Sequence, residues 1–148
     1  MELDSLAAAL QDQFRASVAL SRGEGGIALS IALHDTNSLP LLCKFLFWDA
    51  GCPFGGVTVE EHLGNWRLSY VFLAPGSGWI EVIVQQPPET LSIPSISSAV
   101  HAADWHEREA EDLFGLIFEG HPRLGDFILH DQIWPEGVAP HRKSVDVH

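Results

Sequence analysis

The pattern of apolar positions predicts a helix at the start of the chain and a strand directly after it. Five apolar residues are spaced three and four apart, as on one face of a helix: Leu3, Leu6, Leu10, Phe14 and Val18. The glycines at positions 23, 25 and 26 end this helix. From position 27 to 33, apolar and small or polar side chains alternate, which indicates a strand.

A second helix and three more strands follow in the pattern. The polar run from Asp35 to Ser38 supplies turn and N-cap chemistry, and Pro40 suits a first helical turn. The apolar run after it predicts a buried helix over residues 41–48. Strands are expected at residues 57–62, 66–72 and 80–84, and the short links between them indicate antiparallel neighbours.

This order of elements predicts an α+β two-layer sandwich, with a mostly antiparallel four-stranded sheet and helices on one face. Prolines at positions 87, 88 and 94 mark a connector, after which strand alternation disappears. We therefore expect residues 1–94 to form the α+β core. Residues 95–148 are expected to add a further helix and an extended C-terminal arm to the same single domain.

Charge narrows the choice of partner. The 148 residues include 20 acids against 8 Lys and Arg, a formal net charge of −12. Such a surface repels phosphate backbones and anionic lipid, so nucleic acid is not an expected partner, and basic protein partners remain open. Ordinary solubility is the alternative explanation of this charge. The two cysteines, Cys43 and Cys52, are too few for a disulfide framework, and reduced thiols are expected.

No targeting or membrane-spanning segment is predicted. The first ten residues lack the basic start of a signal peptide. The longest apolar stretch, residues 39–48, is interrupted by Pro40 and Lys44 and falls short of the roughly 20 residues that a membrane helix needs. If the protein works at a membrane, we expect other subunits to hold it there.

A third helix is predicted over residues 105–114. Asp104 is a suitable N-cap, and Glu107 three residues later completes an acidic capping box. Glu107 and Glu109 lie in the early turns, where the helix dipole favours acids. Gly115 suits the position after the last helical residue. The serines at positions 95, 97 and 98 are interpreted as caps at a helix start.

One carboxylate on this helix lies on an apolar stripe. Glu109 is four residues from both Trp105 and Leu113, and a buried carboxylate needs hydrogen-bond donors. Arg108 points to another face and reaches Glu111 and Asp112. The donor to Glu109 is then Arg123, Arg142, a backbone amide or another chain, unless Glu109 is partly exposed or forms an ordinary intrachain ion pair. The sequence leaves these alternatives open.

The same segment resembles a known family. Trp105-His106-Glu107-Arg108-Glu109, then Asp112-Leu113-Phe114-Gly115, then Gly120-His121-Pro122 are ordered and spaced like the signature of the 30-kDa subunit family of respiratory complex I. Ile93-Pro94-Ser95-Ile96 resembles the entry to that signature. Before this point only the order of the elements matches.

The C-terminal residues resemble the hydrogenase relatives of that family. Leu129-His130-Asp131 and Trp134-Pro135-Glu136-Gly137 are similar to subunits of membrane-bound nickel–iron hydrogenases, including formate hydrogenlyase types. Pro140-His141-Arg142-Lys143 resembles the terminal motif of the family. Gly125-Asp126 follows Leu124, where complex I members carry paired arginines. This departure favours the hydrogenase branch. It also puts in doubt a contact with an acidic partner surface, which the paired arginines of complex I members would imply.

No residues for carrying electrons are visible in the sequence. An iron–sulfur cluster needs about four cysteines, and no glycine-rich phosphate loop follows a predicted strand. We expect no catalytic, cofactor-binding or metal-binding residue. The alternative from a different class is an independent metal-dependent enzyme that uses His121, His130 and Asp131, although their spacing is not typical of zinc.

The sequence therefore predicts a non-catalytic accessory subunit, or domain, of a membrane-associated oxidoreductase complex. The resemblance implies two partners, a hydrogenase-like (49-kDa-like) large subunit and an iron–sulfur small subunit, at the cytoplasmic face of the cell membrane. The helix and the arm after it are expected to form the partner interface. Its predicted residues are Trp105, Glu107, Arg108, Glu109, Asp112, Phe114, Gly115, Gly120, His121, Pro122, Leu124, Trp134, Arg142 and Lys143.

Overall fold

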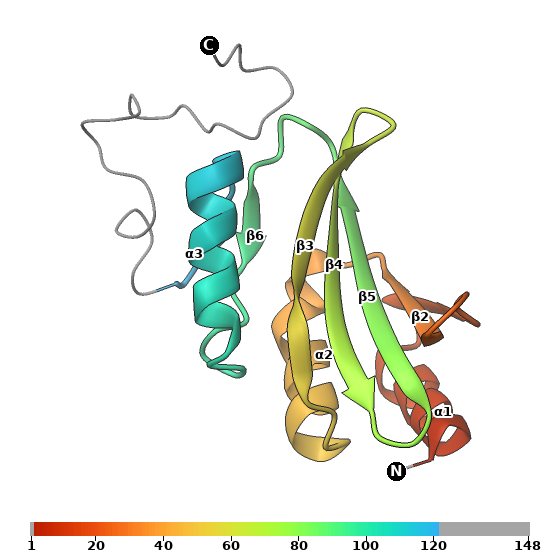
Figure 1. Ribbon diagram of the computed structural model, residues 1–148. Coiled ribbons are helices and arrows are strands. Elements are labelled where there is room, and N and C mark those ends of the chain that lie inside the picture. The colour runs from red at the N-terminus through yellow and green to blue at the C-terminus, as the bar shows by residue number, and fades with distance from the viewer. Residues whose placement is uncertain (1, 122–148) are drawn as a thin grey trace.

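A five-stranded sheet forms the centre of the structure, a computed structural model that describes residues 2–121 (Figure 1). The strands lie side by side in the order β1-β2-β5-β4-β3. Within this sheet β2 and β5 are parallel neighbours, and the other three pairs are antiparallel. The bounds are β1 Val18–Ser21, β2 Ile27–Leu33, β3 Phe54–His62, β4 Asn65–Ala74 and β5 Gly78–Gln86.

The α+β class and the mostly antiparallel sheet are confirmed, but the predicted count of four strands is wrong. The first helix, α1 (Leu3–Phe14), ends one turn earlier than predicted. Val18 does not continue its apolar stripe; it opens β1 and pairs with Leu33 of β2. A buried residue at the start of a strand happened to fall at helical spacing, and four residues of strand are too few to show alternation.

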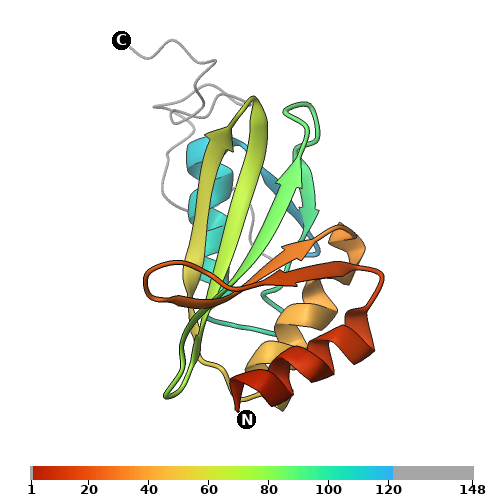
Figure 2. The same cartoon turned by 90° about the vertical axis from the view of Figure 1, so that its right-hand side faces the viewer.

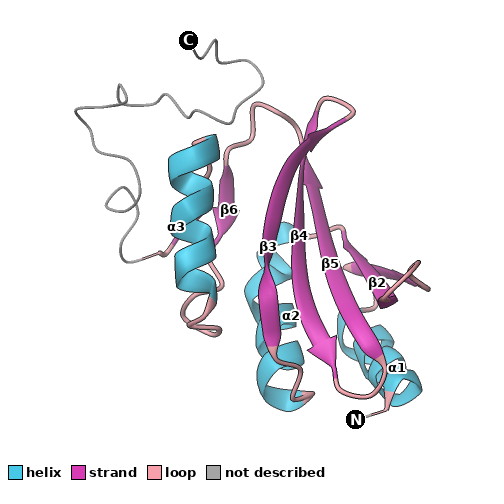
Figure 3. Ribbon diagram, viewed as in Figure 1, coloured by secondary structure: helices cyan, strands magenta, loops and turns pink. Residues whose placement is uncertain are grey.

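The helices lie on one face of the sheet. The 3₁₀ turn η1 (Thr36–Ser38) leads into α2 (Leu39–Lys44), which continues as one π-helical turn, η2 (Phe45–Asp49). Asp35 caps the entry, because its Oδ1 accepts the Asn37 N–H at 3.1 Å. Figure 2 shows α1 and α2 on the same side of the strands, and Figure 3 shows the same layers by element type.

Strand alternation separates a buried face from an open one. The buried face carries large apolar side chains that form the core with the helices, among them Leu29, Ile31, Leu33, Leu68, Tyr70, Phe72, Ile80, Val82 and Val84. From the helices, Leu6, Leu10, Leu39, Leu42 and Leu46 complete this core. Intervening strand residues such as Ser30 and Ile83 are partly exposed on the other face. The alternation in the sequence thus predicted which residues are buried.

A second, smaller unit follows the connector. β6 (Ser92–Pro94) and β7 (Ile117–Glu119) pair in parallel, and α3 (Ala103–Phe114) links them. α3 lies alongside β3 (Figure 1), and the His106 ring meets the Phe54 ring edge-on at 5.6 Å. Ala103 and Ala110 belong to the same hydrophobic core as the sheet. Most of the predicted C-terminal arm, from Pro122 on, lies outside the described residues, and the division at residue 94 stays a prediction.

The structure has no membrane-spanning helix within residues 2–121, since none there is both long and apolar enough to cross a bilayer.

The two faces of the sheet predict unequal costs of truncation. Replacing Ile31, which is fully buried in β2, by alanine is expected to lower the free energy of unfolding by about 2–5 kcal/mol. Ile83 lies on the open face of neighbouring β5, and Ile83→Ala is expected to cost less than about 1.5 kcal/mol. Urea denaturation of both variants measures the difference, and equal costs would contradict this assignment of the faces.

Candidate functional site

The third predicted helix is confirmed, but its N-terminus differs from the prediction. α3 begins at Ala103, and its N-cap, Ala102, makes no side-chain cap. Asp104 therefore lies inside the first turn, and the predicted capping box between Asp104 and Glu107 does not form. The predicted end is confirmed: Gly115 has φ of 74°, and its N–H donates to the Glu111 carbonyl at 2.8 Å.

The face of α3 that meets the core is made by small residues and one acid. Ala103, Glu107 and Ala110 are buried, whereas Trp105 is 54% exposed. The buried carboxylate is therefore Glu107, which is fully enclosed. Glu109 is partly exposed, which is one of the alternatives that the sequence left open. The alanines let the helix approach its neighbours closely. The sequence pattern of Trp105 and Leu113 pointed to a different face of the helix and did not reveal this one.

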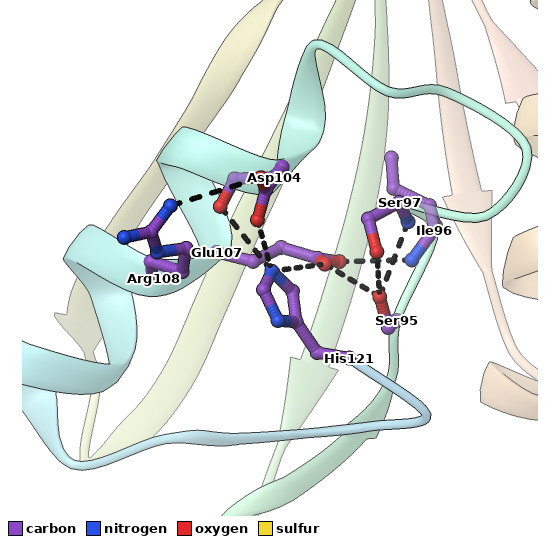
Figure 4. A network of polar contacts seen from close by, with 7 residues as sticks. All are labelled: Ser95, Ile96, Ser97, Asp104, Glu107, Arg108 and His121. Atoms are coloured by element: carbon purple, nitrogen blue, oxygen red, sulfur yellow. Dashed lines mark hydrogen bonds and ion pairs between the residues drawn. The ribbon is translucent and has the colours of Figure 1, made fainter. Parts of the chain in front are cut away.

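Glu107 is held by donors from the segment after β6. The Ser95 hydroxyl donates to Oε1 at 2.6 Å, and the Ile96 N–H donates to Oε2 at 2.8 Å (Figure 4). The Ser97 hydroxyl lies 2.9 Å from that of Ser95. One side chain thus fastens α3 to a segment eleven and twelve positions earlier.

A second group of charges joins the same helix to the residues after β7. His121 Nε2 lies 2.7 Å from Asp104 Oδ1 and 3.9 Å from Glu107 Oε1. Arg108 Nη1 lies 3.8 Å from Asp104 Oδ2, one turn back along α3. Figure 4 shows these side chains converging between the helix and the two flanking segments. We call Ser95, Ile96, Asp104, Glu107 and His121 the signature clasp.

Burial sets the electrostatics of the clasp. It raises the pKa of Glu107 from 4.5 to about 7, the bonds from Ser95 and Ile96 oppose this rise, and the charge of Asp104 adds to it. Behind Glu107 lie Cys43 of α2 and Tyr70 of β4, both fully buried. Burial raises the pKa of each, and the nearby charge of Glu107 raises it further. The carboxylate therefore faces a region of low polarity.

The structure divides the predicted site residues into two sets. Glu107 and His121 are turned inward and belong to the clasp, whereas Trp105, Glu109 and Asp112 lie on the more exposed part of α3. The Arg108 side chain is 16% exposed and forms an ion pair with Asp104 of the clasp. Phe114 packs edge-on against Trp66 with ring centroids 6.0 Å apart, and Gly115 and Gly120 take left-handed turns. Pro122, Leu124, Trp134, Arg142 and Lys143 lie outside the described residues.

Sequence reasoning missed the donors to the buried acid. The sequence predicts a helix cap at Ser95, but no α-helix begins there; its hydroxyl accepts the Ser97 N–H at 3.1 Å and donates to Glu107. The available signal was the serine directly after Ile93-Pro94, twelve positions before Glu107, an acid that needs hydrogen-bond donors. Nothing in the spacing says that these two segments meet.

Within residues 2–121, no three His, Cys, Asp or Glu side chains are arranged to bind a metal ion. His121, from the metal-enzyme alternative, contacts Asp104 instead. His130 and Asp131, the other residues of that alternative, lie outside the described residues.

The fold is shared with two solved proteins. The membrane-bound sulfane sulfur reductase (MBS), an archaeal respiratory membrane complex, contains a chain that matches with a TM-score of 0.79 over 97% of this chain and 85% of that one. A trypsin-resistant fragment of Nqo5, residues 1–134, matches with a TM-score of 0.65 over 80% of this chain and 98% of the fragment. Both are 20% identical to this chain, so the likeness shows the fold.

The sequence match shows the family. Residues 32–148 match the model of the respiratory-chain NADH dehydrogenase 30 kDa subunit, and the chain belongs to this family. The resemblance predicted from the Trp105–Pro122 signature is thereby confirmed.

Relatives come from both predicted branches. A subunit of the NADH-quinone oxidoreductase of Mycobacterium sp. (strain KMS) is 37% identical over 93% of this chain and 66% of that protein. Hydrogenase-4 component G of Escherichia coli (strain K12) is 30% identical over 95% of this chain and 26% of that protein. This chain thus spans just under two thirds of the mycobacterial protein and about a quarter of the hydrogenase component.

The raised pKa of Glu107 predicts a loss of stability with rising pH. Below pH 4.5 the carboxyl is protonated in both the folded and the unfolded chain, so its burial costs little. Between pH 4.5 and about 7 the unfolded chain releases its proton and the folded chain keeps it, so the free energy of unfolding falls. The expected loss is up to about 3 kcal/mol, at 1.36 kcal/mol per pH unit.

Urea denaturation at several pH values measures this loss. Glu107→Gln should remove the added pH dependence, and at pH 5 it should change stability by less than about 1 kcal/mol, because its amide offers the same carbonyl acceptor and donor as the protonated carboxyl. Glu109→Gln, on the same helix but partly exposed, is the control and should keep the wild-type pH dependence. A Glu107→Gln variant with the wild-type slope would contradict the assignment.

Proposed function

We propose that this chain is a non-catalytic accessory subunit, or a domain, of a membrane-associated respiratory oxidoreductase complex. The observation that carries the proposal is the family match over residues 32–148, which includes the helix of the signature clasp. The complex would be of the NADH:quinone oxidoreductase type or of the energy-converting nickel–iron hydrogenase type. Relatives with both kinds of name support this class.

The proposed partners are a hydrogenase-like (49-kDa-like) large subunit and an iron–sulfur small subunit. These subunits would hold the chain at the cytoplasmic face of the membrane. The membrane-bound archaeal complex that contains a chain of the same fold supports a place in such an assembly. The chain itself would bind no cofactor and perform no redox step, so its role would be to position or hold its partners.

The proposed contact surface is the exposed part of α3. Trp105 offers a half-exposed indole, and Glu109 and Asp112 follow at helical spacings of four and three residues. Tryptophan is enriched among the residues that dominate binding energy at interfaces. The inward-facing clasp residues support this surface indirectly, because they fix the helix to the segments on both sides of it.

Purification of the chain, tagged in its native host, tests the proposal. After gentle detergent extraction of the membranes, it should migrate on native gels with a large subunit related to hydrogenases and an iron–sulfur subunit, both identified by mass spectrometry. A chain that migrates alone would contradict the proposal. Stoichiometric zinc, iron or nickel in the lone chain would instead support the metal-enzyme alternative.

Reversing a charge on α3 should weaken assembly without harming the fold. Glu109→Lys places a cation opposite a partner surface that is complementary to an acid. Recovery of the chain in the complex should therefore fall about tenfold or more. Asp12→Lys makes the same charge change on exposed α1 and serves as the matched control. Equal recovery of both variants, with unchanged thermal unfolding, would exclude this face of α3 from the interface.

A further inference from the structure

The exposed side of α2 and η2 carries two large apolar side chains seven positions apart. Leu41 is 63% exposed and Trp48 is 62% exposed, with exposed Lys44 between them along the helix. Leu42, Cys43, Phe45 and Leu46, on the other side, are buried in the core. Leu41 and Trp48, the outer stripe, therefore do not belong to the buried core. Exposed apolar side chains that recur on one face of a helix indicate a binding surface.

The Trp48 side chain is held in place although it is exposed. Its Nε1–H donates to the Ala99 carbonyl at 2.7 Å, and the Phe47 ring meets it edge-on with centroids 5.2 Å apart. The polar atom of the indole is thus already used within the chain, and the exposed remainder is apolar ring. Binding such a fixed ring costs little side-chain entropy, which favours its use as an anchor.

The backbone around Trp48 has an unusual form. η2, Phe45–Asp49, is a π-helical turn. Because a π-turn contains more residues than an α-helical turn, it changes the direction in which Trp48 leaves the helix axis. Single π-turns inside helices occur often at functional sites. The hydrogen bond to Ala99 also links this turn to the segment that enters α3.

We propose that Leu41 and Trp48 form a second docking surface, for a protein subunit that presents an apolar pocket with basic side chains around it. Charge decides among the occupants. With 20 acids against 8 Lys and Arg, a second copy of this chain and an anionic lipid surface are both repelled. Asp49, exposed next to Trp48, would meet the basic border of the pocket, and the aliphatic stem of exposed Lys44 would cover part of its apolar centre.

This inference rests on the proposed function, because it names a further surface by which the chain joins its complex. Carbene footprinting read by mass spectrometry compares labelling of the lone chain with labelling of the chain in its native complex. Labelling of Trp48 and Leu41 should fall roughly fivefold, since 62% and 63% exposed side chains become buried. Leu63, 89% exposed in the β3–β4 turn, should keep its labelling and is the matched control.

The outcomes separate the two proposals. If the chain migrates in the complex but Trp48 is labelled as in the lone chain, the docking surface is wrong and the accessory role stands. If the chain joins no complex, both proposals fail. Loss of Trp48 labelling in the lone chain at high concentration, or on phosphatidylglycerol vesicles, would assign the surface to a second copy or to lipid and would overturn the proposed occupant.

Substitutions give an independent readout. Trp48→Ala should lower recovery of the chain in the complex about tenfold. Trp48→Phe, which keeps an apolar ring, should lower it less. Trp79→Ala, on β5 at 40% exposure, is the matched indole control. If Trp48→Ala fails to fold, Leu41→Ser replaces it, and recovery of the folded variant equal to that of Trp79→Ala would overturn the proposal.

Discussion

The placement of α3 depends on one enclosed carboxylate. Glu107 has no exposed surface, and it accepts one bond from a side chain and one from the backbone of the segment after β6. Removing a charged group from water costs several kcal/mol unless hydrogen bonds offset the cost. If α3 moved away from this segment, Glu107 would lose both donors, so the two hydrogen bonds fix the position of the helix. With Asp104 and His121 on its other side, the acid joins three segments that are distant in sequence.

The residues of the family signature therefore differ in their surroundings. Glu107 and His121 of the motif are turned inward and build the clasp, whereas Trp105 on the same helix is half-exposed. Alternate sides of a helix separate these surroundings within a few positions, since residues two apart point in different directions. Relatives of this chain are named both for NADH-quinone oxidoreductase and for hydrogenase.

Local patterns predicted most of the fold. Alternation placed β2, β4 and β5 and their buried face, and Gly115 marked the end of α3 because only the left-handed conformation closes the helix there. What failed depended on distant contacts. Val18 pairs across a hairpin, and Glu107 is buried because Ser95 and Ile96 lie opposite it, so neither role is encoded in the residues next to them.

A carbon-13 NMR titration of the Glu107 carboxyl in the folded chain tests the central claim most directly. An enclosed acid with two donors should titrate with a pKa near 7, because burial outweighs its hydrogen bonds. The Ile96 amide proton should shift with the same midpoint, since it donates to that carboxylate. A midpoint near the ordinary value of 4.5, with no response at Ile96, would mean that the acid faces water and that the clasp does not exist.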